Sequence, residues 1–140
     1  MRAASEQETS SSLMTAATVF VTTEDCQAIR ALLAVDGIEV IQTAGLEEAI
    51  EALALVVFLD ADGHSEWAHA LQHLVEMRPT AWVVVLARLA DHRMWVEVLS
   101  QGARDLLAKP LFSSELRSAV LGALRTPRYT ETALAARAGG

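Results

Sequence analysis

Short runs of apolar residues alternate along this sequence with longer segments in which apolar residues recur at helical spacing. Runs of the first kind predict β-strands, and segments of the second kind predict amphipathic helices. A regular alternation of the two is typical of a parallel sheet whose strands are joined by crossover helices. Five such units fit in the chain, so the sequence predicts an α/β fold.

The predicted strands differ in how deeply they should be buried. Leu55–Leu59 and Ala81–Leu86 are apolar at successive positions, which is typical of strands covered on both faces at the centre of a sheet. Asp60 directly follows the first of these two runs. The five predicted strands are Thr18–Thr22, Glu39–Gln42, Leu55–Leu59, Ala81–Leu86 and Asp105–Ala108.

The predicted helices end or begin at residues suited to those places. Pro79 prevents the third helix from continuing, Gly102 suits a left-handed cap after the fourth, and Ser113 or Ser114 can cap the last. The five predicted helices cover about 25–35, 46–53, 65–77, 92–101 and 113–125.

Length and composition indicate one domain. A chain of 140 residues, 52% of them hydrophobic, is long enough for one core and too short for two ordinary ones. We expect the domain to span residues 18–125. A disordered, Ser/Thr-rich segment is expected at 1–17, and a tail or linker at 126–140.

Composition also excludes several classes of function. No apolar stretch approaches the ~20 residues of a membrane span, and the first 17 residues lack the apolar core of a secretory signal. The net charge is −7 and the Arg residues are scattered, so no track for a nucleic-acid backbone is predicted. Cys26 is the only cysteine, which excludes an internal disulfide and suits a reducing compartment. We therefore expect a soluble cytoplasmic protein that binds neither membrane nor nucleic acid directly.

In an open parallel sheet, ligands bind at the carboxyl ends of the strands. That edge should carry Asp60 after the third strand and Lys109 after the fifth, and Lys109 is the only lysine among eleven basic residues. A compact ammonium at this one place serves as a point charge, which a planar guanidinium does less well. The segments expected at this edge are Thr22–Asp25, Asp60–Asp62, Ala87–Arg88 and Lys109–Pro110.

Those segments, and above all Gln101–Pro110 with its Gly-Ala and Lys-Pro pairs, resemble the receiver domain of response regulators over about residues 18–124. The resemblance implies a flavodoxin-like, doubly wound, five-stranded parallel sheet of order 2-1-3-4-5 with helices on both faces. It implies a phosphorelay role in which Asp60 accepts a phosphoryl group from a histidine kinase or a phosphotransfer protein. Lys109 would then contact the phosphoryl oxygens.

The resemblance further implies Mg²⁺ held by Asp60, an acidic pair after the first strand and the backbone carbonyl of Asp62. The chemistry of the residues agrees, because a carboxylate and a phosphoryl group are both negative and need nearby cations to meet. Lys109 supplies one, and Mg²⁺ prefers hard oxygen ligands of this kind.

Departures from the family pattern weaken parts of this prediction. The acidic pair is either Thr23-Glu24 or, one residue later, Glu24-Asp25, so the Mg²⁺ site should be weak. Ala87 stands where the family has a Thr or Ser, and it has no hydroxyl for a phosphoryl oxygen. Leu106 replaces the aromatic residue often found in the fifth strand.

Three functions therefore stay open. The first is a phospho-accepting, non-enzymatic receiver. The second is a pseudo-receiver that keeps the fold and acts as a binding or dimerisation module without phosphorylation. The third is a phosphatase, because Asp60-Ala61-Asp62-Gly63 also resembles the Asp-x-Asp-Gly motif of the haloacid dehalogenase family, although that motif belongs near the chain start.

Two further groups of residues have an ordinary structural explanation beside a functional one. His69 and His73 lie four apart, as a metal pair would, but without an evident third ligand they indicate a solvated helix face. Met94 and Trp95 make the fourth predicted helix more apolar than one buried stripe requires. In the family that the chain resembles, the fourth helix, fifth strand and fifth helix form the usual partner face, so the resemblance implies a homodimer through these elements.

Overall fold

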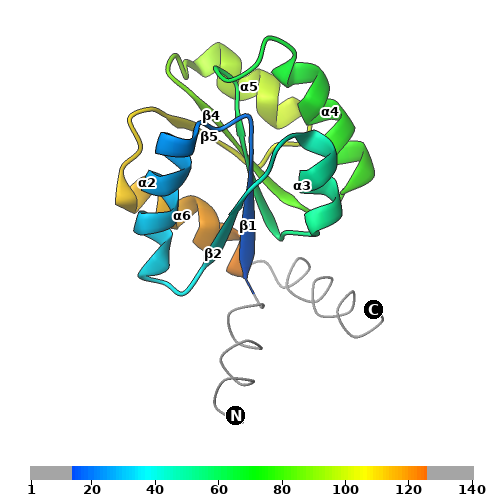
Figure 1. Cartoon of the computed structure of the whole chain (residues 1–140). Coiled ribbons are helices and arrows are strands. Elements are labelled where there is room, and N and C mark those ends of the chain that lie inside the picture. The colour runs from blue at the N-terminus through cyan, green and yellow to red at the C-terminus, as the bar shows by residue number, and fades with distance from the viewer. Residues whose placement is uncertain (1–13, 126–140) are drawn as a thin grey trace.

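The computed structural model describes residues 14–125, which form one five-stranded parallel sheet with helices on both faces (Figure 1). The strand order is β2-β1-β3-β4-β5, which confirms the predicted topology. The strands are β1 (Thr15–Val19), β2 (Glu39–Gln42), β3 (Val56–Asp60), β4 (Trp82–Ala87) and β5 (Asp105–Ala108). Residues 1–13 and 126–140, which include most of the predicted terminal segments, lie outside the described residues.

The helices divide between the two faces of the sheet. Helices α2 and α6 cover one face, and α3, α4 and α5 cover the other (Figure 1). Side chains such as Ile29 and Leu116 pack on the first face, and Leu71 and Val98 pack on the second. The helices are α2 (Thr23–Ala34), α3 (Leu46–Ala52), α4 (Trp67–Met77), α5 (His92–Ser100) and α6 (Ser113–Leu124).

The prediction for the first strand was wrong by three residues. The strand is Thr15–Val19 rather than Thr18–Thr22, because Ala16 pairs with Val40 of β2 and Val56 of β3 and is fully buried there. The segment after residue 17 is richer in β-branched and aromatic residues, so local preference alone favours it as the strand. Pairing with two neighbouring strands outweighed that preference, so the ordered fold takes in residues 15–17, which were expected to be disordered.

The earlier end of β1 alters the path of the chain between this strand and α2. Phe20 comes directly after the strand with a φ of 63° and turns the chain. Helix α2 then begins at Thr23, and the side chain of Thr22 accepts a hydrogen bond from the backbone N–H of Asp25 at 3.1 Å. The acidic residues Glu24 and Asp25 therefore lie inside the first turn of a helix.

The ends of two later helices test the predicted caps. Gly102 has a φ of 108° at the end of α5, as predicted. The prediction that Ser113 or Ser114 caps α6 was wrong, because Ser113 is already the first helical residue and Phe112 precedes it. Within residues 14–125, no side chain accepts a capping hydrogen bond at the start of α6. None of the helices in that part of the chain is both long and apolar enough to cross a membrane.

Candidate functional site

Asp60 ends the central strand β3 at the carboxyl edge of the sheet. The strand lies between β1 and β4, and all five of its residues are buried, so only 2% of Asp60 is exposed. One carboxylate oxygen, Oδ1, accepts a hydrogen bond from the backbone N–H of Asp62 at 2.8 Å. The other, Oδ2, accepts one from Nζ of Lys109 at 2.7 Å.

Lys109 reaches Asp60 from the end of β5, two strands away. The backbone N–H of Lys109 donates to the carbonyl of Ala87 at 3.0 Å, which fixes the residue beside β4, and the Lys109–Pro110 peptide bond is cis. Its side chain is only 15% exposed. Although burial alone would lower the pKa of Lys109, hydrogen bonds to Asp60 and Asp62 raise it above the ordinary lysine value. The ammonium of Lys109 is therefore firmly protonated.

Asp62 contributes its carboxylate to the site, whereas the resemblance to receiver domains implied a role only for its backbone carbonyl. Oδ2 of Asp62 lies 3.1 Å from Nζ of Lys109 and accepts a hydrogen bond from the backbone N–H of Arg88 at 2.8 Å. Burial would raise the pKa of Asp62, but the hydrogen bonds from Arg88 and Lys109 outweigh it and lower that pKa. The sequence could not predict the contact between Asp62 and Arg88, because its donor is a backbone amide rather than a characteristic side chain.

The two candidates of the acidic pair are placed differently. Asp25 lies toward the site, with Oδ2 4.0 Å from Nζ of Lys109. Glu24 is exposed, and among the described residues it does not line the pocket around Asp60. Both carboxylates lie in the first turn of α2, where they also interact favourably with the helix dipole.

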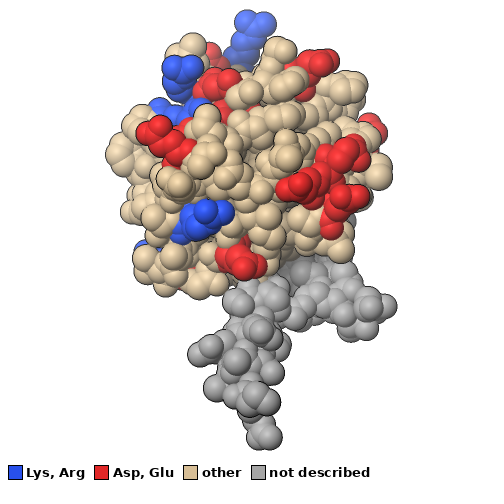
Figure 2. Space-filling model, in the orientation of Figure 1, with Lys and Arg blue, Asp and Glu red and all other residues tan. Residues whose placement is uncertain are grey.

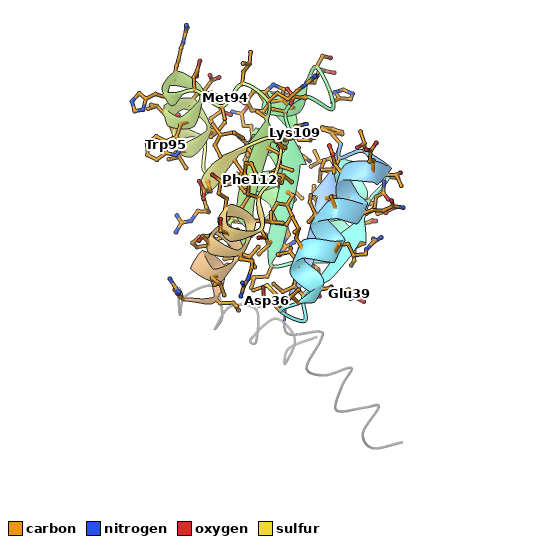
Figure 3. The ribbon with its side chains drawn as sticks, turned by 90° about the vertical axis from the view of Figure 1, so that its left-hand side faces the viewer. Asp36, Glu39, Met94, Trp95, Lys109 and Phe112 are labelled. Atoms are coloured by element: carbon orange, nitrogen blue, oxygen red, sulfur yellow. The ribbon has the colours of Figure 1, made fainter. Side chains whose placement is uncertain are left out.

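A pocket of about 450 Å³ opens above the Asp60–Lys109 contact. Three carboxylates and one ammonium face it, and Figure 3 shows Lys109 near the loops at the upper edge of the sheet. The pocket is lined by Thr22, Asp25, Asp60, Asp62, Gly63, Arg88, Lys109 and Pro110.

The residues of this pocket do not fit Mg²⁺ as they are arranged. Within residues 14–125, no three His, Cys, Asp or Glu side chains are grouped so that they could hold a metal ion. The carboxylates of Asp60 and Asp25, two of the predicted ligands, lie 2.7 Å and 4.0 Å from Nζ of Lys109 instead, and the carboxylate of Asp62 lies 3.1 Å from it. The ammonium thus provides the positive charge of the site.

Ala87 ends β4 and is 2% exposed. A second pocket of about 560 Å³ lies against it, beneath the exposed Arg88 and Leu89. The structure therefore leaves open space beside Ala87, whose side chain has no hydroxyl. This pocket is lined by Ala61, Asp62, Trp67, Ala87, Arg88, Leu89 and Met94.

A contact between the loops after β1 and β3 shapes the site and was not predicted. A Cβ atom at Gly63 would lie 1.9 Å from the carbonyl oxygen of Phe20, so only glycine fits there. The ring of Phe20 stacks on His64 with 4.6 Å between centroids. The Asp62-Gly63 pair was a turn signal, but nothing in the sequence indicated its partner.

The histidine pair on α4 shows no sign of a metal site in the described part of the chain. His69 is exposed, and Nε2 of His73 lies 3.8 Å from Oε1 of Glu47 on α3.

Several solved structures share this fold. A response regulator receiver domain protein from Clostridium thermocellum matches with a TM-score of 0.71 at 20% identity, over 82% of this chain and 97% of its own. A two-component response regulator from Clostridium difficile matches with a TM-score of 0.68 at 22% identity, over 81% and 97%. A CheY-like protein (tadZ) from Pseudomonas aeruginosa matches with a TM-score of 0.64 at 23% identity, over 78% and 91%.

This chain has the fold of a receiver domain. No protein-family model matches the sequence, and no curated protein matches it. Within this fold, Asp60 ends the third strand, Lys109 directly follows the fifth, and the two meet at the carboxyl edge, while Ala87 ends the fourth.

Several large apolar side chains are exposed on the described surface, among them side chains of α5 and of the residue before α6. Trp95 of α5 is 44% exposed and Phe112, just before α6, is 60% exposed, whereas Val98 is fully buried. Figure 3 shows Trp95 pointing outward. On the face drawn in Figure 2, acidic side chains gather over α3, and the basic side chains form no continuous patch.

Proposed function

We propose that this chain acts as a receiver domain of a cytoplasmic two-component phosphorelay. Asp60 accepts a phosphoryl group from a histidine kinase or a phosphotransfer protein, and the outer helices carry the signal. The observation that carries this proposal is the 2.7 Å contact between Oδ2 of Asp60 and Nζ of Lys109, two groups from different strands that converge at the edge where such sheets bind ligands.

The chemistry follows from this pair. A carboxylate oxygen of Asp60 attacks the phosphorus of the donor, an O–P bond forms, and the bond from phosphorus to the donor's leaving group breaks, with its electron pair leaving on the donor. The carboxylate and the phosphoryl oxygens are all negative, so their approach is unfavourable without a cation. The ammonium of Lys109 reduces that repulsion and can bind a phosphoryl oxygen by a charge-assisted hydrogen bond.

The present arrangement of the carboxylates does not favour Mg²⁺ at this site. Asp25, Asp60 and Asp62 are the nearest carboxylates, but they already surround Lys109. We assign no step to the metal. Titration of the chain with Mg²⁺, followed by NMR at Asp25 and Asp60, would reveal a site that opens when the ammonium moves.

The apolar surface of α5 and the start of α6 supports a protein partner on that side. Trp95, Val96 and Phe112 are exposed there, and aromatic residues are enriched at protein interfaces. We propose this surface as the contact for an output partner or a second copy of the chain. Sedimentation velocity over a range of concentrations tests for the second copy.

A pseudo-receiver is the second candidate, and two observations favour it. Ala87 has no hydroxyl to bind a phosphoryl group, and the carboxylate of Asp62 already occupies Lys109. A pseudo-receiver would keep its partner binding after Asp60→Asn, whereas a phospho-switch would lose its response.

The phosphatase alternative has less support. Its general acid would be Asp62, which must hold a proton at working pH. The pKa of Asp62 is lowered by the hydrogen bonds from Arg88 and Lys109, against the effect of burial, so this carboxyl is poorly suited to donate a proton. A phosphatase assay with a small phosphate ester tests this alternative.

The proposed acceptor is tested by incubation with acetyl phosphate and intact-mass measurement. We expect a gain of one phosphoryl group, located at Asp60 by peptide mapping and lost in Asp60→Asn. Asp62→Asn is the matched control, because it removes a carboxylate from the same pocket and keeps the proposed acceptor. The absence of any gain in both the wild-type chain and Asp62→Asn would rule out the proposal.

A further inference from the structure

The carboxylate of Asp62 connects three loops at the carboxyl edge of the sheet. Asp62 lies in the loop after β3, and its Oδ2 accepts a hydrogen bond from the backbone N–H of Arg88, in the loop after β4, at 2.8 Å. The same oxygen lies 3.1 Å from Nζ of Lys109, at the end of β5. One anionic oxygen thus holds a backbone amide and an ammonium that belong to two other strands.

The position of this oxygen is set by its neighbours. The backbone N–H of Asp62 donates to Oδ1 of Asp60 at 2.8 Å, which fixes residue 62 directly above the proposed acceptor. Gly63 follows it and lies against the carbonyl of Phe20, where no larger residue fits. The loop is therefore held from both sides, and the Asp62 carboxylate is directed toward Lys109 and Arg88.

The charges around Lys109 indicate that an incoming anion would have to compete with carboxylates for the ammonium. Three carboxylates lie within 4.0 Å of one ammonium. The guanidinium of Arg88 is 78% exposed, with Nε 3.7 Å from Asp62, so solvent weakens its effect. A phosphoryl group on Asp60 would need the ammonium and amide donors that Asp62 holds, because anionic oxygens bind most strongly to such donors.

We propose that Asp62 is an internal anion that occupies the place of a phosphoryl oxygen, holds the loops after β4 and β5 to the acceptor, and restrains phosphoryl transfer to Asp60. The part that concerns transfer rests on the proposed function. Asp62 is a positioning residue, and it must release Lys109 and the Arg88 amide before a phosphoryl group can take them.

The first test does not depend on phosphorylation. NMR spectra at neutral pH would be compared for the wild-type chain, Asp62→Asn, Asp62→Ala and the control Glu76→Gln, which removes an exposed carboxylate from α4. We expect the Arg88 amide signal to shift and its hydrogen exchange to speed up about tenfold in Asp62→Ala, with a smaller change in Asp62→Asn, whose neutral oxygen still accepts. The side-chain signals of Lys109 should move in both, and neither group should move in Glu76→Gln.

The second test measures the rate of labelling by acetyl phosphate. Loss of the negative charge that lies 3.1 Å from Nζ of Lys109 should speed labelling of Asp62→Asn about tenfold over the wild type and Glu76→Gln. If the Arg88 and Lys109 signals stay in place in both Asp62 variants, the inference is wrong. It is also wrong if the wild type is labelled and the Asp62 variants are labelled no faster. If the Arg88 and Lys109 signals move but neither the wild type nor any variant is labelled, the result supports the role of Asp62 as an internal anion and contradicts the proposal that Asp60 accepts a phosphoryl group.

Discussion

At the scale of single residues, the site depends on one lysine that faces a carboxylate 2% exposed to solvent. Asp60 and Lys109 could be predicted because each directly follows an apolar run, and such positions gather at one edge of a parallel sheet. In the receiver interpretation Asp62 was assigned only a backbone role, because its carboxylate accepts from the backbone amide of Arg88, a donor that every residue type except proline supplies. The sequence therefore predicts that Asp60 and Lys109 meet, but not that the carboxylate of Asp62 also contacts Lys109.

Lys109→Met should destabilise the fold strongly. It leaves the buried Asp60 carboxylate without its ammonium and close to two other carboxylates, a loss of about 3 kcal/mol in the free energy of unfolding. The control is Arg117→Gln, which breaks the Arg117–Asp36 pair, whose side chains are 47% and 25% exposed. That change should cost under about 1 kcal/mol. Equal costs in urea unfolding would contradict this account of the site.

The contribution of Asp62 to stability should depend on pH. Its folded-state pKa is lowered because the hydrogen bonds from Arg88 and Lys109 outweigh the effect of burial. The ionised carboxylate therefore stabilises the fold above the unfolded-chain pKa of about 4, and the contribution disappears as the pH falls through the lower folded-state value. The difference in Tm between the wild type and Asp62→Asn should be steady from neutral pH to about pH 5 and shrink below pH 4. A difference that grows in acid would show the opposite sign of shift.

At the scale of elements, the loops after β1, β3, β4 and β5 build the site. The residues at which these strands end decide which side chains the site contains. The third strand could be predicted to within one residue at each end, because an apolar run followed directly by Asp60 leaves few positions at which the strand could begin or end. The first could not, since Ala16 and Ala17 have low strand preference and are buried only through pairing with β2 and β3. That shift moved the acidic pair into α2 and brought Phe20 into the loop beside Gly63.

Gly63→Ala should disturb the loop that carries Asp62. The added Cβ would lie 1.9 Å from the backbone oxygen of Phe20, so the two loops must separate, at a cost of about 1–3 kcal/mol in unfolding free energy. Gly45→Ala is the control, because a Cβ at Gly45 meets nothing within 4 Å, and it should cost under about 1 kcal/mol. Urea unfolding measures both. A Gly63→Ala variant as stable as Gly45→Ala would mean that the loops are not in close contact.

Ala87→Thr should increase the change in the loop after β4 when an anion binds at Asp60. The pocket beside Ala87 has room for the larger side chain, and its hydroxyl can bond an anion held at Asp60. We expect beryllofluoride to shift the amide signals of residues 88–90 more in Ala87→Thr than in the wild type. Ala87→Val is the control, because it fills the same space without a hydroxyl. Equal shifts in the Thr and Val variants would show that volume, rather than hydrogen bonding, controls this loop.

At the scale of the whole molecule, the parallel sheet brings together groups that are 49 positions apart in the sequence. Two apolar cores, one on each face, hold the strands in the order β2-β1-β3-β4-β5, and that order places the ends of β3, β4 and β5 side by side. The topology could be predicted from the alternation of strands and helices with the family resemblance. The contacts between loops could not, because each depends on the spatial meeting of residues with no common pattern.

The most direct measurement is a beryllofluoride titration followed by the amide and side-chain NMR signals of the chain. If Asp60 and Lys109 form a phosphoryl-accepting site, the signals of residues 60–63, Arg88 and Lys109 should shift with saturation, and Asp60→Asn should abolish the shifts. Signals at these residues that do not respond, or that respond equally in Asp60→Asn, would contradict the account.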